Sequence, residues 1–369
     1  MKLVFRVDAS SKIGSGHVYR TRNLAIELSK NGHEILFVTR SDEGNLINLL
    51  KKDFDVLVLP KNIENKNFNK ENYLFNFDQI NDAEKTFELI TQSIFKDFNF
   101  LLIDHYFIDS IWHKHFKKLA TKLSYNYKLI VIDDKANRRH LSDILIDQNY
   151  FHPTYKDRYK NLVSEKCIQL LGTKYTIIPS IYKELHKVAQ PRNSISRILI
   201  FFGGSDHNEY SYKVIKKLMN KKFSKYYVDI IMGIKNKNIE LIRTLISDNK
   251  KIVLHTNLEN LAFLITRADY SIGAGGSTNW ERACLGLPGS VLSISEDQIP
   301  ICKSLAKNNF INYFENIDSL LKNLEIILLE KDSSFIEQST NLLKLVDGLG
   351  SSRISEILES IYDLKFTKQ

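Results

Sequence analysis

The chain has 369 residues, more than one compact core usually holds, so two domains are the first expectation. Hydrophobic residues make up 43% of the sequence, but no window reaches the roughly 20 apolar residues that a membrane span needs. The formal charge of +9 comes from lysines scattered among asparagines, without a basic stretch that carries interleaved aromatic residues. The sequence therefore predicts a globular protein that neither binds nucleic acid nor inserts stably into a membrane.

The cysteines point to a reducing compartment. Cys167, Cys284 and Cys302 are far apart and odd in number, which gives neither a disulfide framework nor the spacing of metal ligands. The first apolar run begins too early, and charged residues follow it too soon, for a secretory signal. We therefore expect a cytoplasmic protein with reduced thiols.

A β-α-β unit opens the chain. The first strand is predicted over residues 2–7, and turn-forming residues replace hydrophobic ones over residues 8–12. A helix with apolar residues at roughly helical spacing follows, and Gly32 stands where a C-terminal glycine cap belongs. Residues 34–38 are the second predicted strand.

Two glycines and a histidine, Gly14, Gly16 and His17, lie at the junction of the first strand and the first helix. Glycines at such a junction let the backbone turn tightly and approach a ligand, and the free N–H groups of the first helical turn favour an anion. Position 19 is a tyrosine, so the pattern is not the G-x-G-x-x-G dinucleotide fingerprint. A functional site and a plain tight turn remain equally weighted alternatives.

Strands and helices continue to alternate through the first half, with strands predicted over residues 54–59, 100–103, 128–132 and 144–146. Strands without polar alternation are typical of a parallel sheet covered on both faces. Ligands bind such sheets at the carboxyl ends of the strands, where polar residues gather in this sequence. We therefore predict one crevice there, lined by Asp8, His17, His105, Tyr106, Asp133 and Asn149.

Two features of this half have a structural interpretation. An aspartate after a strand often caps the next turn, and this role is favoured for Asp133 and Asp134. Residues 61–79, rich in Asn, Lys and Glu, interrupt the alternation and predict a surface insertion without chemistry.

A polar stretch over residues 183–196, which contains Pro191, is the predicted linker to a second alternation. This second half opens with a strand over residues 197–202 and a glycine turn over residues 203–206. The sequence thus predicts two Rossmann-like α/β domains facing a cleft. We expect the first domain to span residues 1–185 and the second to span residues 196–345.

A second glycine cluster follows a short strand near residue 273. Its helix start, with two hydroxyl residues, is suited to a diphosphate, and a glutamate one turn later is suited to two ribose hydroxyls. The alternative is a capping box between Thr278 and Glu281. Because the small residues exceed what a cap needs, nucleotide binding is favoured. The predicted contacts are Gly275, Gly276, Ser277, Thr278 and Glu281.

A series of motifs runs along nearly the whole chain: R-x-D-x(5)-G-x-G-H-x-x-R from Arg6, D-A-x-x-T from Asp82, D-H-Y from Asp104, D-D from Asp133, G-G-S-D from Gly203, G-A-G-G-S-T-x-W-E from Gly273 and D-G-x-G-x-x-R-I from Asp347. In these motifs the chain resembles the UDP-sugar hydrolases of the pseudaminic acid pathway, which are similar to GT-B glycosyltransferases. The resemblance implies a GT-B-like fold. It also implies that residues 346–369 form a last helix that packs back on the first domain.

The resemblance further implies hydrolysis of UDP-2,4-diacetamido-2,4,6-trideoxy-β-L-altrose to UDP and the free sugar, in pseudaminic (nonulosonic) acid biosynthesis and flagellin glycosylation. It implies that His17 is the general base for inverting attack of water at the anomeric carbon, with no metal and no cofactor. A neutral imidazole suits that role. The candidate catalytic residues are His17 and Tyr106, and the candidate substrate-binding residues are Asp8, Gly14, Gly16, Asn149, Gly275, Gly276, Ser277, Thr278, Glu281 and Gln298.

The expected partner is a UDP-sugar substrate, and the sequence indicates no particular protein partner. Three alternatives stay open. A GT-B glycosyltransferase with a UDP-sugar donor needs an acceptor site, and a non-hydrolysing UDP-sugar epimerase needs additional acid and base groups. A non-catalytic nucleotide-sugar-binding protein would not need His17.

Overall fold

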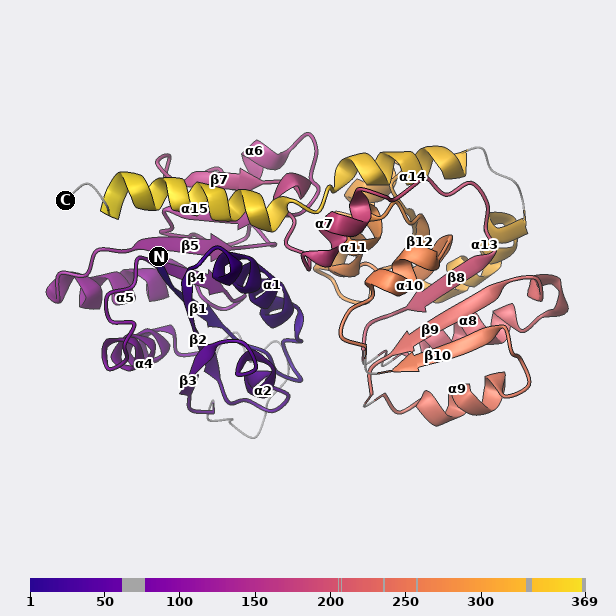
Figure 1. Cartoon of the computed structure of the whole chain (residues 1–369), viewed down its shortest axis with the longest axis horizontal. Coiled ribbons are helices and arrows are strands. Elements are labelled where there is room, and N and C mark those ends of the chain that lie inside the picture. Colours follow the sequence, from indigo (N-terminus) through magenta and orange to yellow (C-terminus); the bar gives the residue numbers. More distant parts are fainter. Residues whose placement is uncertain are drawn as a thin grey trace. The chain divides into compact units, whose positions relative to one another are not determined.

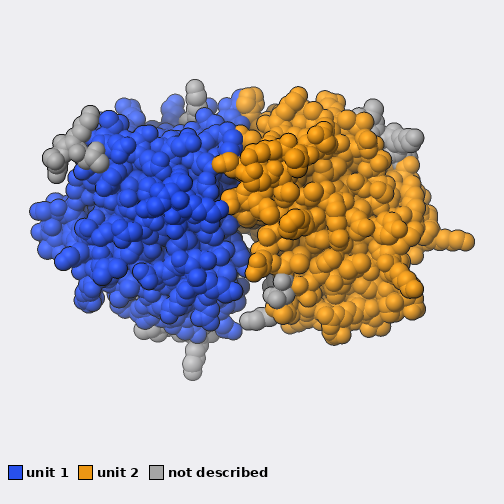
Figure 2. All heavy atoms as spheres, viewed as in Figure 1, with its two compact units in different colours: residues 1–149, 153–178, 349–369 blue, residues 150–152, 179–348 orange. Residues whose placement is uncertain are grey.

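The computed structural model describes residues 1–61, 77–204, 206, 208–234, 236–256, 258–329 and 334–366. The chain divides into two compact units, coloured separately in Figure 2. The first unit comprises residues 1–149, 153–178 and 349–369, and the second comprises residues 150–152 and 179–348. Most of the predicted insertion, residues 62–76, lies outside the described residues.

The first unit alternates strands and helices (Figure 1). Its elements are β1 (Lys2–Val7), α1 (Gly16–Lys30), β2 (Glu34–Arg40), α2 (Ile47–Leu50), β3 (Asp55–Leu59), α4 (Gln79–Thr91), β4 (Phe100–Asp104), α5 (Ser110–Lys122), β5 (Lys128–Ile132), β6 (Ile144–Asp147), α6 (Tyr155–Arg158), β7 (Ile168–Leu171), the 3-10 turn η1 (Thr173–Tyr175) and α15 (Gly350–Phe366).

The described strands of this unit form one sheet in the order β3-β2-β1-β4-β5-β6-β7, and every neighbouring pair is parallel. The strand order reverses between β1 and β4. In open parallel sheets the crevice at the carboxyl ends of such a pair is the usual ligand site. The residues that follow β1 and β4 are therefore the first place to look for chemistry.

Helices cover both faces of this sheet. Successive residues of β1 point to opposite sides, and the apolar side chains on both sides are buried under helices. Leu3 and Phe5 belong to one core with α1 and α15, and Val4 belongs to the other core with α4 and α5 (Figure 1). The last helix lies in the first unit, where α15 contacts α1. A side chain on Gly350, the first residue of α15, would begin 2.1 Å from the carbonyl oxygen of Thr176, so only glycine fits there.

The second unit repeats the alternation. Its elements are α7 (Ile181–His186), β8 (Arg197–Phe201), α8 (Tyr210–Leu218), the 3-10 turn η2 (Lys221–Phe223), β9 (Tyr227–Met232), α9 (Ile239–Ile246), β10 (Ile252–Thr256), α10 (Ala262–Arg267), β11 (Tyr270–Ala274), α11 (Thr278–Cys284), β12 (Gly289–Leu292), α12 (Gln298–Lys307), β13 (Asn312–Phe314), α13 (Ile317–Leu329) and α14 (Ser334–Leu345).

The described strands of the second unit also form a parallel sheet, in the order β10-β9-β8-β11-β12-β13. The strand order reverses between β8 and β11, each of which is followed by a glycine turn. The prediction of parallel-sheet α/β domains is confirmed. Within the described residues, no helix combines the length and the apolar character of a membrane span.

The boundary between the units differs from the predicted one. The N-terminal part of the first unit ends at Ile178, whereas the sequence predicted residue 185 and a linker over residues 183–196. The short helix α7 lies in this region and is fixed on α11, with His186 Nδ1 2.6 Å from the carbonyl oxygen of Cys284. The polar composition that suggested a linker therefore belongs partly to the outer face of a packed helix.

Candidate functional site

The turn after β1 brings His17 to the carboxyl edge of the first sheet. Gly14 has a φ of +82°, a left-handed conformation that favours glycine, and its N–H donates to the carbonyl oxygen of Ser10 at 2.9 Å. Gly16 is the first residue of α1. Nothing lies within 4 Å of the point where a side chain would begin at Gly14 or Gly16. His17 thus lies in the first turn of a helix, next to two glycines that leave open space.

The imidazole of His17 is buried and is held by Asp104, the last residue of β4. Its Nδ1 lies 2.6 Å from Asp104 Oδ1. Because an ionised carboxylate only accepts hydrogen bonds, Nδ1 carries a hydrogen, and in the neutral form of the ring the lone pair is on Nε2. No described residue hydrogen-bonds to Nε2. The arrangement leaves one basic nitrogen of His17 available.

Arg20, one turn after His17 on α1, fixes the same carboxylate. Its Nε and Nη2 donate to the two oxygens of Asp104 at 2.5 and 2.7 Å. Burial alone would raise the pKa of Asp104, but the charge of Arg20 and the hydrogen bonds from Arg20 and His17 outweigh burial and hold that pKa well below its usual range. Asp104 therefore remains a carboxylate and a constant acceptor for the Nδ1 hydrogen.

Arg20 also reaches a second carboxylate, Asp134, in the segment after β5. Its Nη1 donates to both oxygens of Asp134, at 2.9 and 2.8 Å. Asn149, after β6, donates to Asp134 Oδ1 at 2.8 Å, and the hydroxyl of Tyr106, after β4, donates to Oδ2 at 3.3 Å. Asp134 thus joins Arg20 to residues that follow two other strands, Tyr106 after β4 and Asn149 after β6.

Tyr106 also packs against the imidazole. The ring centres of Tyr106 and His17 are 4.2 Å apart and the rings are nearly perpendicular, at 84°. The ammonium group of Lys135 lies 4.1 Å from the centre of the Tyr106 ring. The edge-to-face contact between Tyr106 and His17 fixes the plane of the imidazole, in addition to the hydrogen bond that Nδ1 donates to Asp104.

Asp8 lies in a separate cluster, in which both oxygens of its carboxylate accept hydrogen bonds. Arg6 donates to its two oxygens at 2.6 and 2.8 Å, and the backbone N–H of Arg40 donates to Oδ1 at 2.7 Å. Because His105 Nδ1 accepts from the N–H of Phe107, its Nε2 carries a hydrogen, which faces Asp8 Oδ2 at 3.2 Å. These donors surround the carboxylate, so the predicted substrate contact does not fit this position. We infer that Asp8 supports the fold.

The buried arginine of this cluster joins two elements of the first unit. Arg6 also donates to both oxygens of Asp82 on α4, at 3.1 and 2.6 Å. Trp112 Nε1 of α5 donates to the same carboxylate at 2.9 Å. The charges of the paired carboxylates outweigh burial and raise the pKa of Arg6, so the guanidinium stays charged. The R-x-D and D-A-x-x-T motifs therefore form one buried ion cluster.

The two neighbouring aspartates after β5 have different environments. Asp133 is buried, accepts from the backbone N–H of Ala136 at 2.8 Å and accepts from the hydroxyl of Tyr159 at 3.1 Å. This is the structural role that the sequence favoured for both residues. Asp134 differs because it binds Arg20 and so belongs to the His17 cluster.

The second glycine cluster is shaped by close contacts rather than by charges. A side chain on Gly275 would begin 2.3 Å from Cys302 Sγ, so this residue must be glycine. At Gly276 the nearest atom to such a side chain is Gln298 Nε2, at 3.7 Å. Gln298 begins α12, and its Oε1 accepts from the N–H of Ile294 at 3.0 Å. The turn after β11 and the start of α12 therefore lie together.

The start of α11 contains the two hydroxyl residues and the glutamate of this cluster. The side chain of Ser277 makes no cap hydrogen bond among the described residues, and α11 begins at Thr278. The carboxylate of Glu281 accepts instead from the hydroxyl of Tyr182 on α7, at 2.9 Å to Oε2. Burial raises the pKa of Glu281 to about 7, although Tyr182 and Arg282 act to lower it. Glu281 therefore does not form the capping box that the sequence offered as an alternative.

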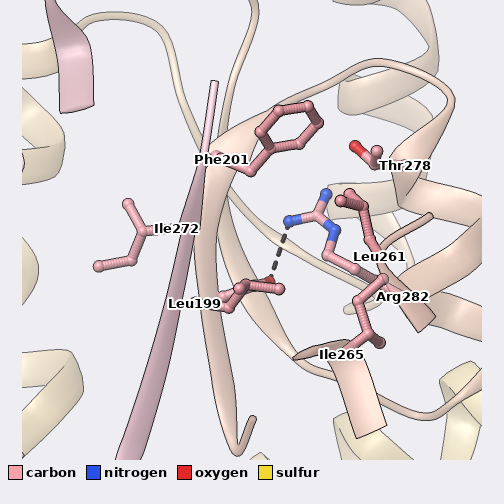
Figure 3. Close-up of a pocket in the computed structure, with 9 residues that line it drawn as sticks. Leu199, Phe201, Leu261, Ile265, Ile272, Thr278 and Arg282 are labelled. Carbon is pink, nitrogen blue, oxygen red and sulfur yellow. Dashed lines mark hydrogen bonds between the residues drawn. The ribbon is translucent and has the colours of Figure 1, made fainter. Parts of the chain in front are cut away.

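Arg282 lies beside the same turn with no carboxylate partner in the described part of the chain. Figure 3 shows its guanidinium between Leu199 of β8 and Leu261 of α10, at a small cavity that Thr278 also lines. It donates to the hydroxyl of Ser271 at 3.0 Å. Burial lowers the pKa of Arg282 to about 10, so the group is still a cation at neutral pH.

The glycine turn after β8 has a structural task. Asp206, the last residue of the G-G-S-D motif, accepts from the backbone N–H groups of Tyr210 and Ser211 at 3.0 and 2.8 Å, which caps α8. Among the residues that the structure describes, no group of three or more His, Cys, Asp or Glu side chains is placed to hold a metal ion.

The structure places the predicted site residues in two groups. His17, Tyr106 and Asn149 belong to the first unit, and the residues from Gly275 to Glu281 belong with Gln298 to the second. Sequence reasoning gave no role to four residues that complete these groups, namely Arg20, Asp104, Tyr182 and Arg282. Two of them could have been found from the sequence, because Arg20 is one helical turn after His17 and Asp104 ends the strand beside β1.

Comparison with known sequences gives distant relatives, and no family model matches the chain. The chain is 26% identical over 372 residues to an uncharacterized protein of Methanocaldococcus jannaschii, covering 99% of this chain and 67% of that one. It is 25% identical over 310 residues to the UDP-2,4-diacetamido-2,4,6-trideoxy-beta-L-altropyranose hydrolase of Campylobacter jejuni, covering 84% and 98%. It is 24% identical over 214 residues to the spore coat polysaccharide biosynthesis protein SpsG of Bacillus subtilis, covering 52% and 58%.

Comparison with solved structures establishes the fold. MurG of Acinetobacter baumannii matches with a TM-score of 0.63 at 12% identity, covering 97% of this chain and 99% of that one. A putative UDP-N-acetylglucosamine 2-epimerase from Listeria monocytogenes matches with a TM-score of 0.59 at 12% identity, covering 100% and 97%. The Streptomyces glycosyltransferase SsfS6 complexed with thymidine diphosphate matches with 0.59 at 11% identity, covering 98% and 99%. The chain shares the GT-B fold of these structures, and the predicted fold class of two parallel-sheet α/β domains is confirmed.

Proposed function

We propose that this chain hydrolyses a UDP-activated 2,4-diacetamido-2,4,6-trideoxyaltrose to UDP and the free sugar. The observation that carries the proposal is the His17–Asp104 pair, 2.6 Å apart, which leaves Nε2 as an oriented base. The relative from Campylobacter jejuni, aligned over 84% of this chain, supports the substrate class. The GT-B fold supports a nucleotide-sugar as the ligand.

In the proposed reaction, the oxygen of a water molecule attacks the anomeric carbon while Nε2 of His17 takes one of its protons. The bond from the anomeric carbon to the diphosphate oxygen breaks, and its electron pair leaves with UDP. Attack from the face opposite the leaving group inverts the configuration. In the imidazolium that forms, the Nδ1 hydrogen stays on the ring and remains hydrogen-bonded to Asp104. The negative charge of Asp104 stabilises the imidazolium. Arg20 keeps that carboxylate ionised and in place.

UDP departs as a stable anion, so it needs stabilisation of negative charge more than a proton. We propose that the backbone N–H groups and the hydroxyls of Ser277 and Thr278, at the start of α11, bind the diphosphate. The buried cation of Arg282 adds positive potential at the same turn. Glu281 accepts from the ribose through Oε1, which receives no hydrogen bond from a described residue.

We assign the sugar to the residues around Asp134. The amide nitrogen of Asn149 is used by Asp134 and Asp147, at 2.8 Å each, so its oxygen is the atom left for a sugar group. The absence of side chains at Gly14 and Gly16 leaves room for the substrate next to His17.

The test is an assay of the purified protein with the UDP-sugar and no acceptor. UDP release is followed with a coupled detection system, and the configuration of the sugar released first is read by NMR of the anomeric proton. We expect equimolar UDP and free sugar with inverted configuration. Release of UDP only after an acceptor is added would contradict hydrolysis.

A glycosyltransferase that uses a UDP-sugar donor is the second candidate. The likeness in fold to the Streptomyces glycosyltransferase favours it, and the same base at His17 would then activate an acceptor hydroxyl in place of water. The acceptor-free assay separates the two, because a transferase leaves most of the UDP-sugar intact.

A further inference from the structure

Tyr182 is a buried side chain that no sequence motif singled out. It lies on α7 with none of its surface exposed, and its hydroxyl donates to Glu281 Oε2 at 2.9 Å. Burial raises the pKa of Tyr182 well above its usual value, and the charge of Glu281 raises it further. The hydroxyl therefore keeps its hydrogen and acts as a permanent donor to the carboxylate.

The helix that carries Tyr182 is fixed on α11 at several points. His186 Nδ1 lies 2.6 Å from the carbonyl oxygen of Cys284, and Cys284 Sγ donates to the carbonyl oxygen of Tyr182 at 3.6 Å. A side chain on Gly348 would begin 2.8 Å from the Cα of Lys183, so the chain also passes closely on this side. These contacts hold the Tyr182 hydroxyl at a defined place relative to Glu281.

A donor such as the Tyr182 hydroxyl lowers the pKa of Glu281 and so favours its carboxylate form. Its pKa of about 7 means that the acid and the carboxylate are both populated at neutral pH, and only the carboxylate accepts at both oxygens. The ionisable groups that face it are Tyr182 from α7 and Arg282 and Cys284 from α11, with Asp347 beside Cys284. Of these, Tyr182 makes the direct hydrogen bond.

We propose that Tyr182 is a positioning residue for ribose recognition: it holds Oε2 of Glu281 so that Oε1 accepts from the ribose hydroxyls. This inference rests on the proposed function, in which Glu281 contacts the ribose of UDP. In this role Tyr182 contributes to the discrimination between ribonucleotides and their deoxy analogues, although the Tyr182 side chain does not touch the nucleotide.

The experiment compares the binding of UDP, 2′-deoxy-UDP and 3′-deoxy-UDP by calorimetry. For Tyr182→Phe we expect UDP to bind about tenfold more weakly, since a hydrogen bond to a charged group is lost, while the deoxy analogues change by less than about twofold. Tyr226→Phe is the matched control, because Tyr226 is buried in the same unit and donates to the carbonyl oxygen of Leu328. This control should leave all three affinities unchanged.

A double-variant cycle shows whether the effect passes through the carboxylate. In the Glu281→Ala background, adding Tyr182→Phe should change UDP affinity by less than about twofold, because the partner of the hydroxyl is gone. Equal losses in both backgrounds would contradict a role through Glu281. Equal weakening of UDP and its deoxy analogues would indicate general damage and would also contradict it.

Two further outcomes separate this inference from the proposed function. If the unaltered protein does not bind UDP, the proposed function fails and the inference fails with it. If UDP binds and Glu281→Ala weakens it while Tyr182→Phe does not, only the role of Tyr182 is wrong. Should Tyr182→Phe not fold, 3-fluorotyrosine at position 182 supplies a stronger donor of nearly the same size. It should tighten UDP binding, and unchanged binding would overturn the inference.

Discussion

The two candidate regions are built in different ways. Around His17, charged side chains form a continuous series in which Arg20 joins Asp104 to Asp134, with bonds of 2.5 to 2.9 Å. The turn after β11 is shaped by glycines, and the charges near it lack ionic partners among the described residues. There, burial raises the pKa of Glu281 to about 7 and lowers that of Arg282 to about 10.

This difference separates two tasks. A buried carboxylate that is paired with arginine keeps one charge state over a wide pH range, which suits a histidine that must transfer a proton at one fixed atom. Charged groups without ionic partners are stabilised when a ligand of complementary charge binds, which suits a binding site. We therefore expect changes in the His17 region to reduce turnover and changes in the glycine region to reduce affinity.

The largest expected effect is that of His17→Asn. Asparagine keeps a donor for Asp104 but has no basic nitrogen, so turnover should fall by about 10² to 10⁴-fold while UDP affinity changes by less than about twofold. Steady-state UDP release and calorimetry measure the two quantities. His115→Asn is the matched control, since His115 pairs with Glu84 near the surface of the same unit. Undiminished turnover would remove His17 from the mechanism.

Asp104→Asn should follow, with kcat lower by about 10²-fold and KM nearly unchanged. The amide can donate to Nδ1, which would move the imidazole hydrogen to Nε2 and remove the lone pair from the side that meets water. Asp97→Asn, which breaks the exposed pair with Lys2, is the control. A loss confined to KM would place Asp104 in binding instead, and the distinction between the regions would fail.

Asp8→Asn should act on stability rather than on activity. Breaking a buried, hydrogen-bonded ion pair costs about 3 kcal/mol in the free energy of unfolding, since Arg6 keeps its charge. Urea denaturation measures that loss, and we expect kcat/KM of the folded variant to change by less than about threefold. A large rise in KM without loss of stability would restore the substrate contact that the sequence predicted for Asp8.

In the glycine region, Gly275→Ala should weaken UDP binding by about tenfold, because its Cβ would begin 2.3 Å from Cys302 Sγ and displace the turn. Adding Cys302→Ala gives the new methyl group room and should restore most of the affinity. Gly276→Ala, with the nearest atom at 3.7 Å, is the comparison and should leave the melting temperature unchanged. Failure of Cys302→Ala to rescue would show that the contact with Cys302 is not the cause.

The smallest expected effect is a dependence of UDP affinity on pH. Glu281 loses its proton as pH rises through about 7 and becomes an acceptor for both ribose hydroxyls. Affinity should therefore rise by about fivefold between pH 6 and pH 8. UDP has its own titration in this range, so Glu281→Gln is measured in parallel and should lack the additional rise. Parallel profiles for the two proteins would argue against Glu281 as a ligand.

The strands were predictable because buried parallel strands are continuous apolar runs. β1 and β5 have the predicted bounds, Lys2–Val7 and Lys128–Ile132, and Gly32 has the positive φ of a glycine that ends a helix, +82°. These features depend on residues close together in the sequence. Local patterns of that kind also located both glycine turns.

The partners of the site residues were harder to predict. Where two polar residues stand at the end of a strand, adjacent side chains point to different sides. The sequence therefore did not distinguish Asp134 from Asp133, or Asp104 from His105. Tyr182 and Glu281 are 99 residues apart, and nothing local marks their contact. For the same reason the capping-box alternative was plausible for Glu281 until the structure supplied its actual partner.

The central claim is attack of water at the anomeric carbon, and isotope labelling tests it most directly. The UDP-sugar is incubated with the protein in H₂¹⁸O without an acceptor, and both products are examined by mass spectrometry. We predict one ¹⁸O atom in the free sugar and none in UDP. Label in UDP would show attack at phosphorus, and an intact UDP-sugar would show that hydrolysis is not the activity.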